Sequence, residues 1–505
     1  MPSEMFGFLA LPPLLTAFAL AVGMLGGLIH GERCERITAC LAMAGTVVTA
    51  LLVATALLLK ATSGLADHLA LATWIQSDDY RIALSSSLDY LSLSMAAMIA
   101  LLGLLTLKFS INYMHRETGY HRFFLILSMF IGAMTLLVTA GNAALTFAGW
   151  ELAGVSSYLL IGYAYDRPNA ARNAKRAFLT NRLGDAGFLL GIFLAQIWVG
   201  NLEWNAIAEV APQLPLWQRD VLACCFVIAA MAKSGQLPFS PWLTRAIEGP
   251  TPSSAIFYGA LLVHAGVYLI LRLQPVLDQA PAAANLIAVI GAATAFYGWY
   301  CGLTQTDVKS ALIFSTMAQL GLMFLEAGMG LWQLVWWHLA AHAGVRTYQF
   351  LTAPSLMHQT LGIPPRPVPA WFGQFRFLYL ASLQRLWIEP LGDRFAARPI
   401  ADVGRDLHVL ETQFVEPAFG LPTPQRDTQP THASVLQASG LAGSLVSKLS
   451  DWLYWFEEKL VLQGLGQNML NSGRRLGASL NRFEELLNQP RYLVILIIAT
   501  LMFVF

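Results

Sequence analysis

Charged side chains stand within long apolar stretches of this sequence. Glu151 is the single charge of "FAGWELAGVSSYLLIGY", and Lys233 is the single charge of "VLACCFVIAAMAKSGQLPF". Burying a charge in apolar surroundings is costly unless the group is paired or functional. A lysine that releases and regains its proton beside a carboxylate has the chemistry of a proton relay. Two opposite charges on neighbouring helices also form a structural ion pair, and both interpretations remain open.

Three further ionisable residues recur at intervals of four. His338, His342 and Arg346 occur in "VWWHLAAHAGVRTYQF", so in a helix all three lie on one face. Two histidines at this spacing can bind a metal, but no glutamate or third ligand stands at a metalloprotease spacing. We therefore predict a polar helix face and no metal site.

Two other positions allow simpler explanations. Arg182 and Asp185 lie three residues apart in "FLTNRLGDAGF", the spacing of a mutual ion pair on a helix. His264 stands alone in "FYGALLVHAGVYL". A buried histidine is commonly a hydrogen-bonded core residue, and histidine also relays protons near neutral pH. Both interpretations of His264 remain open.

Gly235 and Pro238 follow Lys233 closely and predict a break in its helix. Proline lacks a backbone N–H and clashes with the preceding turn. At membrane depth, non-helical backbone is tolerated only where it is buried in protein or lines water. The end of the first half-helix carries partial negative charge, and Lys233 lies in that last turn. The sequence therefore places a titratable lysine at a helix break.

Long apolar segments must hold these residues. Of the 505 residues, 56% are hydrophobic and only 12% are charged, about half the charged fraction of an average soluble domain. Most apolar runs reach the roughly 20 residues that cross a bilayer as a helix. They lie near residues 6–29, 37–59, 90–107, 123–140, 143–165, 177–200, 221–240, 253–271, 282–303, 310–331, 332–353 and 492–505. The predicted fold is an all-α polytopic membrane protein with about twelve transmembrane helices, the seventh of them broken.

The end of the chain has a different composition from the expected transmembrane domain, residues 1–355. Residues 356–440 are rich in proline and polar residues, which predicts an irregular cytoplasmic segment. In residues 441–489, apolar residues recur at intervals of three and four, which predicts an amphipathic helix along the membrane. A surface helix packed on the protein's own loops has the same pattern. Residues 490–505 predict a terminal membrane anchor.

Lysine and arginine gather in alternate loops, which predicts the orientation of the spans. Loops after odd-numbered runs hold most of them, so we expect the N-terminus outside and residues 356–489 in the cytoplasm, with the chain in the cell inner (plasma) membrane. The net charge of +1 argues against nucleic-acid binding. The five cysteines form no CxxC pair, and no nucleotide, haem, flavin or iron–sulfur motif occurs, so we expect no cofactor in this chain.

Six segments resemble the antiporter-like subunits of respiratory complex I, above all its distal subunit (NuoL, or subunit 5), and the related Mrp antiporters. They run in colinear order over about residues 85–355. They are "GWELAGVSSYLLIGY", "AKRAFLTNRLGDAGF", "MAKSGQLPFSPWL", "EGPTPSSAIFYGALLVHAGVYLILR", "QTDVKSALIFSTMAQLGLMF" and "HLAAHAGVRTYQFL". The resemblance implies an antiporter-like helical fold that ends in a lateral amphipathic helix and an anchor helix.

The same resemblance implies roles for individual residues. Glu151 and Lys233 correspond to a proton-input pair, in which the glutamate tunes the proton affinity of the lysine. The other matching positions are Arg182 and Asp185, a charged pair; His338 and His342, part of a central hydrated axis; and Asp307 and Lys309, which match a TDxK motif. We expect His264 and Lys309 to belong to the relay, and Arg182, Asp185, Asp307 and Arg346 to support it.

The chain departs from this pattern at three points. Arg346 stands where the complex I subunit has a titratable lysine, and arginine does not deprotonate in proteins. Tyr258 replaces a histidine of the eighth helix, and His264 is the candidate to take over its role. No counterpart is found for the spans that carry the family's exit lysine. These departures argue against a complete series of half-channels.

A shortened subunit of this kind is most similar to the membrane subunit of DAB-type inorganic-carbon transporters (DabB). That resemblance implies a large partner similar to carbonic anhydrase (DabA), which would hold the zinc. The predicted function is conduction of protons, or Na⁺, coupled to CO₂/bicarbonate uptake. The alternative is a NuoL-like proton-pumping subunit of an NADH-quinone oxidoreductase, with complex I subunits as partners, or an Mrp-type cation/proton antiporter. The simplest hypothesis is a scaffold protein whose charges only hold its helices together.

Overall fold

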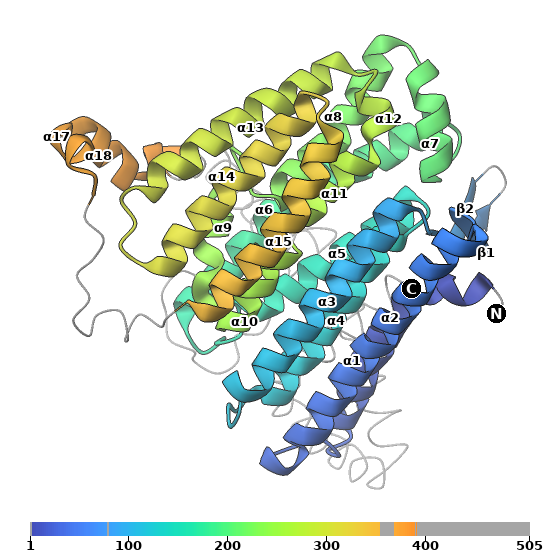
Figure 1. The fold of residues 1–505 in the computed structure, drawn as a ribbon, viewed down its shortest axis with the longest axis horizontal. Helices are drawn as coiled ribbons and strands as arrows, with labels where there is room; N and C mark the ends of the chain where they lie inside the picture. Colours follow the sequence, from blue (N-terminus) through green and yellow to red (C-terminus); the bar gives the residue numbers. More distant parts are fainter. Residues whose placement is uncertain (1–2, 78–79, 354–367, 389, 391–505) are drawn as a thin grey trace, which may run out of the picture. The chain divides into compact units, whose positions relative to one another are not determined.

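The apolar runs of the sequence form helices in the computed structural model, which describes residues 3–77, 80–353, 368–388 and 390 (Figure 1). Nearly all of these residues lie in a unit that includes residues 1–386. The first eleven runs give α1 Leu11–Leu25, α2 Glu35–Ser63, α3 Tyr90–Tyr113, α4 Tyr120–Thr139, α5 Ala143–Ile161, α6 Pro168–Trp198, α8 Leu216–Lys233, α10 Thr251–Ser254 with η5 Ala255–Ala260 and α11 His264–Arg272, α13 Pro281–Gly302, α14 Val308–Gly328 and α15 Trp332–Thr352. The predicted helical multi-span membrane fold is confirmed. The twelfth run, 492–505, lies outside the described residues, so the count of twelve stays a prediction.

Shorter elements connect these helices. They are η1 Ser3–Phe8, η2 Glu32–Cys34, β1 His68–Ser77, β2 Tyr80–Ser87, α7 Trp204–Val210, η3 Ala211–Gln213, α9 Pro241–Arg245, η4 Ala246–Glu248, α12 Gln274–Leu277, α17 Ala370–Gln374, α18 Arg376–Leu383 and η6 Arg385–Trp387. Helices α17 and α18 fall within the predicted polar segment 356–440. The rest of that segment, the predicted amphipathic helix 441–489 and the predicted anchor 490–505 lie outside the described residues.

Helices in the middle of the bundle are enclosed, and those at its edge expose apolar faces. By length and composition, eight helical segments of the described chain qualify as membrane spans: α2 to α6, α10 with η5 and α11, α13 and α14. Among them, α4 and the α10–α11 segment are almost wholly buried, whereas α2, α6 and α13 bury about a third of their residues. On α6, for example, Phe193 and Ile197 are exposed. Such faces suit contact with lipid.

Helices α13 and α14 pack with their backbones in contact (Figure 1). A Cβ atom on Gly298 of α13 would lie 2.7 Å from the carbonyl oxygen of Phe314, and one on Gly328 of α14 would lie 2.7 Å from that of Ala284. Distances this short exclude any side chain, so glycine is required where these helices touch. Small residues have this role wherever membrane helices approach closely.

The predicted break after Lys233 is confirmed. Helix α8 ends at Lys233, Gly235 adopts a left-handed conformation with φ of +62°, and helical structure resumes only at Pro241. A second irregular stretch lies beside it, because the π-helical turn η5 and residues 261–263 interrupt the neighbouring span before His264. The Ser234 hydroxyl donates to the Val263 carbonyl at 2.7 Å, so the two breaks are in contact. The sequence did not indicate this second break.

Strands β1 and β2 form an antiparallel hairpin that the sequence analysis did not predict. Glu203 holds it to the bundle, because its carboxylate contacts His68 at 2.7 Å and accepts from the Ser85 hydroxyl at 2.8 Å. Asn142, which caps α5, donates to the Ala83 carbonyl at 2.7 Å. We call this side of the bundle, where α3, α5 and α15 begin and α4, α11 and α14 end, the hairpin end.

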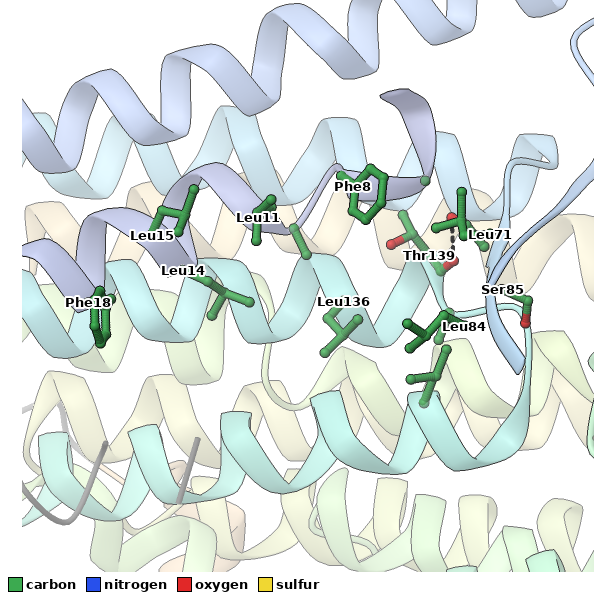
Figure 2. Close-up of a pocket in the computed structure, with 15 residues that line it drawn as sticks. Phe8, Leu11, Leu14, Leu15, Phe18, Leu71, Leu84, Ser85, Leu136 and Thr139 are labelled. Atoms are coloured by element: carbon green, nitrogen blue, oxygen red, sulfur yellow. Dashed lines mark hydrogen bonds between the residues drawn. The ribbon is translucent and has the colours of Figure 1, made fainter. Parts of the chain in front are cut away.

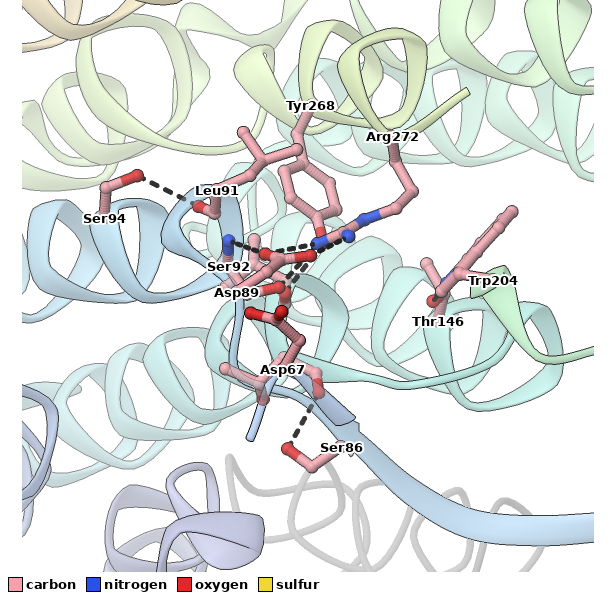
Figure 3. A network of polar contacts seen from close by, with 12 residues as sticks. Asp67, Ser86, Asp89, Leu91, Ser92, Ser94, Thr146, Trp204, Tyr268 and Arg272 are labelled. Carbon is pink, nitrogen blue, oxygen red and sulfur yellow. Dashed lines mark hydrogen bonds and ion pairs between the residues drawn. The ribbon is translucent and has the colours of Figure 1, made fainter. Parts of the chain in front are cut away.

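A polar network joins α3 to α11 at the hairpin end (Figure 3). Asp89 caps α3 by accepting from the Ser92 backbone N–H at 2.8 Å, and it also forms an ion pair with Arg272. Arg272 donates to the Ser92 hydroxyl at 2.6 Å and to the Tyr268 hydroxyl at 3.0 Å. Burial disfavours the charged carboxylate, but the charge of Arg272 and the hydrogen bonds outweigh burial and lower the pKa of Asp89. The pair therefore stabilises the fold when Asp89 is ionised.

We expect Asp89→Asn to destabilise the solubilised chain by about 1.5–3 kcal/mol at pH 7, the range for hydrogen bonds to charged groups. Asparagine still caps a helix, so the change isolates the lost charge. Because the folded-state pKa lies below the unfolded value of about 4, the contribution is complete above that value and is lost as pH falls through the folded-state pKa. Thermal unfolding from pH 3 to pH 8 measures it.

The matched control is Asp67→Asn, which removes an exposed partner of Lys60 and is expected to change stability little. A difference between Asp89→Asn and the parent that persists undiminished at pH 3, or that is absent at pH 7, would contradict the assignment.

Candidate functional site

Lys233 is the last residue of α8, and only 1% of its surface is exposed. Its ammonium donates to the Trp150 backbone carbonyl at 3.2 Å and lies 4.7 Å from the centre of the Trp150 ring. The ring face attracts a cation, and the carbonyl accepts one of its three N–H bonds. Helix α5 therefore holds the buried lysine.

Glu151, the next residue of α5, forms an ion pair with Arg182 of α6. Its second oxygen, Oε1, is buried and accepts no hydrogen bond from the described residues. Arg182 also contacts Asp185 at 3.1 Å, which confirms the ion pair predicted from their spacing. The Trp150 indole N–H donates to Asp185 at 2.7 Å. Arg182 thus lies between two carboxylates.

These five residues form one group, which we call the charge cluster: Trp150, Glu151, Arg182, Asp185 and Lys233. A Cβ atom on Gly154 would lie 3.4 Å from the Lys233 ammonium and 3.5 Å from an Arg182 nitrogen, so the two cations flank one position. The two negative and two positive charges of the cluster cancel when all four side chains are ionised. Among the described residues, Glu151 and Lys233 share the cluster without a direct hydrogen bond, whereas the sequence led us to expect a direct pair.

A second polar group begins beside the break in α8. Ser234 follows Lys233, and its contact with Val263 brings the charge cluster next to His264, the first residue of α11. Nε2 of His264 lies 2.9 Å from Nδ1 of His342 on α15, and both rings are buried. The structure thus joins two of the predicted relay histidines directly.

Arg346 determines which ring nitrogens of these histidines carry protons. Its Nε–H can only donate, so Nε2 of His342, 3.4 Å away, accepts. A neutral His342 then carries its proton on Nδ1 and donates it to Nε2 of His264. Arg346 also donates to Ser315 at 2.8 Å and to Gln349 at 2.9 Å.

His338 lies one turn before His342, with the two ring centres 6.4 Å apart. Its Nδ1 lies 2.9 and 3.1 Å from the two oxygens of Glu326, and its Nε2 lies 2.8 Å from the Gln319 side-chain oxygen. Both partners are on α14. Glu326 and Gln319 were not among the residues predicted from the sequence. The signal was a single carboxylate near the end of the apolar run 310–331. We call His264, His342, His338 and Glu326 the histidine line.

The remaining predicted residues lie apart from these two groups. Asp307 caps α14 by accepting from the Ser310 backbone N–H at 2.8 Å, which is a structural role. Lys309 donates to the Thr251 hydroxyl at 2.7 Å, and Thr251 contacts the Tyr113 hydroxyl at 2.9 Å, at the end of the bundle opposite the hairpin. Tyr258 is fully buried in η5. Among the described residues, no three His, Cys, Asp or Glu side chains form a group that could hold a metal ion.

A cavity of about 350 Å³ lies elsewhere, between α1, the hairpin and the facing ends of α4 and α5 (Figure 2). Leucine and phenylalanine side chains dominate its lining, among them Phe8, Leu11 and Leu136. Its hydroxyl groups are used internally, as where Ser86 donates to the Thr139 carbonyl at 3.0 Å. This apolar cavity contains none of the charged or histidine residues described above, so it is not the ionic site.

Two family models and several curated proteins are similar to this chain, and all of them are described as parts of oxidoreductases or antiporters. Residues 140–363 match a family model described as NADH:quinone oxidoreductase/Mrp antiporter, TM. Residues 74–124 match one described as NADH-ubiquinone oxidoreductase (complex I), chain 5 N-terminus. Among curated proteins, the chloroplastic NAD(P)H-quinone oxidoreductase subunit 5 of Zygnema circumcarinatum is 36% identical over 360 residues, 70% of this chain and 51% of that protein. The NADH-ubiquinone oxidoreductase chain 5 of Rhizopus stolonifer is 36% identical over 351 residues, 70% of this chain and 53% of that protein.

Solved structures show the same fold. A chain of the Mrp complex from Dietzia sp. DQ12-45-1b superposes with a TM-score of 0.58 at 25% identity, over 67% of this chain and 36% of that chain. A chain of the membrane-bound sulfane sulfur reductase, an archaeal respiratory membrane complex, superposes with a TM-score of 0.60 at 19% identity, over 69% and 70% of the two chains.

This chain spans about half the length of the curated relatives it matches. The matches with the subunit 5 proteins and the Mrp complex confirm the family resemblance noted in the sequence, and the DAB-type assignment stays a prediction. Both groups of polar residues, from Trp150 to Arg346, fall within the longer matched segment. Over residues 74–124 and 140–363, the chain therefore matches the antiporter-like membrane subunits that NADH:quinone oxidoreductases and Mrp antiporters share.

Proposed function

We propose that this chain is the cation-translocating subunit of a membrane complex of the NADH:quinone oxidoreductase or Mrp type, and that the ion is the proton. The carrying observation is the buried charge cluster at the helix break, with Lys233 held by Trp150 and with the Glu151–Arg182–Asp185 ion pairs beside it. Buried ion pairs are weak stabilisers, so stability alone does not account for four charges at membrane depth.

Within this proposal, Lys233 binds and releases the transported proton. Lysine changes its protonation readily when buried, and a hydrogen bond to one carbonyl leaves its other protons available. Glu151, whose Oε1 has no described hydrogen bond, supplies the partner carboxylate. Arg182 keeps its proton and fixes the positions of Glu151 and Asp185.

The histidine line relays the proton between the break and the hairpin end. His264 and His342 are in hydrogen-bond contact, and imidazole accepts a proton on one nitrogen while it donates from the other. Arg346 does not take part in the transfer, because guanidinium does not deprotonate. It acts instead as a fixed cation that sets the tautomer of His342. Lys309, at the opposite end of the bundle, is the candidate for exchange with water there.

Partners and orientation are part of the proposal. The subunit 5 relatives and the Mrp chain are parts of complexes, which favours oxidoreductase or antiporter subunits as partners. The arginine and lysine distribution favours an N-terminus outside the cell inner membrane and residues 356–489 in the cytoplasm. Coupling to CO₂/bicarbonate uptake with a zinc-containing partner is the second candidate. It is favoured by Arg346, which stands where the complex I subunit has a titratable lysine, so the chain departs there from the complex I pattern.

Purification of the tagged full-length chain from its native membrane, in mild detergent, separates the two candidates. We expect oxidoreductase or antiporter membrane subunits to co-purify, and the reconstituted complex to acidify or alkalinise vesicles. A stoichiometric zinc protein similar to carbonic anhydrase would replace the first candidate with the second. A complex that moves Na⁺ and leaves vesicle pH unchanged in the presence of a proton carrier would overturn the choice of ion.

A further inference from the structure

Glu326 occupies an unfavourable position for a carboxylate. It lies in the last turn of α14, which ends at Gly328. The C-terminal end of a helix carries partial negative charge, which repels a carboxylate and attracts cations. Its side chain is only 16% exposed, so water compensates little. The negative charge is therefore unfavourable for the helix itself, and this points to a role for the charge.

His338 is the ionic partner that the structure provides. Both oxygens of Glu326 face Nδ1 of His338, whose side chain is 18% exposed, while Gln319 occupies the other ring nitrogen. Gln319 and Glu326 lie seven residues apart, about two turns of α14, so both lie on one face of that helix. From this face they contact the two nitrogens of the His338 ring. The imidazole is therefore oriented with one nitrogen fixed on the carboxylate.

The contacts of Glu326 extend the histidine line toward the surface. His264 is fully buried and His342 nearly so, whereas His338 and Glu326 are partly exposed. Beyond Glu326, the chain turns at Gly330, with φ of +75°, and Met329 is exposed. Access to water thus increases from the two inner histidines to His338 and Glu326, whose side chains are similarly exposed, and the line reaches the hairpin end.

We propose that Glu326 is the terminal proton-exchange group of this chain at the hairpin end. This inference rests on the proposed function and adds a residue and an exit to it. The His338 imidazolium transfers its Nδ1 proton to the carboxylate, and Glu326 releases that proton to water. A proton relayed from His342, across the 6.4 Å between the two ring centres, then restores the imidazolium. Each cycle moves one proton and returns both side chains to their starting charges; the same steps run in reverse for uptake.

The test compares side chains at position 326 that differ in their ability to titrate. The full-length chain with its co-purified partners is reconstituted in vesicles, and the initial proton flux under an imposed potential is measured with a pH-sensitive dye. Glu326→Gln keeps a hydrogen-bond acceptor for His338 but cannot exchange protons, and we expect it to lower the flux at least about 10-fold, a conservative value for loss of a proton-transfer group. Glu326→Asp and Glu326→His titrate and should retain most of it.

Glu209→Gln is the matched control, because Glu209 is an exposed carboxylate at the end of α7, outside the histidine line, and its flux should match the parent. If Glu326→Gln fails to accumulate in the membrane, Glu326→Asp and Glu326→Asn make the same comparison between isosteric side chains. Flux retained in the amide variants, or lost equally in the titratable and amide variants, would overturn the proposal.

Lys233→Ala, measured in the same vesicles, separates this inference from the proposed function. Loss of flux in Lys233→Ala with normal flux in Glu326→Gln would refute the exit at Glu326 alone. Normal flux in Lys233→Ala would refute the proposed function itself.

Discussion

Replacing Lys233 with alanine is expected to lower proton flux by at least about 10²-fold, the lower bound for removal of a proton-transfer group. Lys233 is the buried ammonium that contacts Trp150 at the helix break, and among the described cations of the charge cluster it is the one that can release its proton, because Arg182 keeps its own. Flux under an imposed potential in reconstituted vesicles measures the effect, and the amount of chain in the membrane is measured in parallel.

Lys233→Arg distinguishes proton exchange from electrostatics. Arginine keeps the positive charge but does not release its proton, so we expect this variant to be as inactive as Lys233→Ala. Lys175→Ala, at an exposed position on α6, controls for loss of a lysine and should have normal flux. Activity in Lys233→Arg would show that only the charge matters, and the relay role would be wrong.

Replacing His342 with glutamine is expected to reduce flux by about 10²-fold, in the range for general acid–base groups. His342 is the central member of the histidine line, in contact with His264 at 2.9 Å and adjacent to His338. Glutamine retains a donor and an acceptor for His264 and Arg346, so the contacts survive while proton transfer does not. His30→Gln changes an exposed histidine outside the line and serves as the control.

A double-mutant cycle tests whether His264 and His342 act in series. If a proton must pass through both, His264→Gln, His342→Gln and the double variant lose similar amounts of flux, because the second change removes nothing further. Effects that multiply in the double variant would instead indicate two independent contributions. In that case the hydrogen bond between the rings would not be part of one path.

The sequence predicts much of this architecture because membrane spans obey simple rules. Length and hydropathy gave the helices, proline and glycine gave the break after Lys233, and the spacing of Arg182 and Asp185 gave their ion pair. These features depend on residues close together in the chain, so a single sequence contains enough information to predict them.

Features that depend on contacts between distant segments were missed. Arg182 forms an ion pair with Glu151 because α5 and α6 pack together, whereas the sequence led us to expect that Glu151 would pair with Lys233. The hairpin was missed because its strands form only a short alternating pattern between two long apolar runs, which is also typical of a loop. The contact that holds it to the bundle comes from Glu203, which is distant in the sequence. Glu326 was missed for the same reason, since its partner His338 lies on the next helix.

The glycine contact between α13 and α14 limits how the protein can move. Two helices whose backbones touch cannot slide past one another without collision, so this pair behaves as a single rigid strut. We therefore expect any helix motion beside the histidine line to displace α15 relative to this pair. The side chains between α14 and α15, Gln319 and His338 among them, form the interface at which that motion would take place.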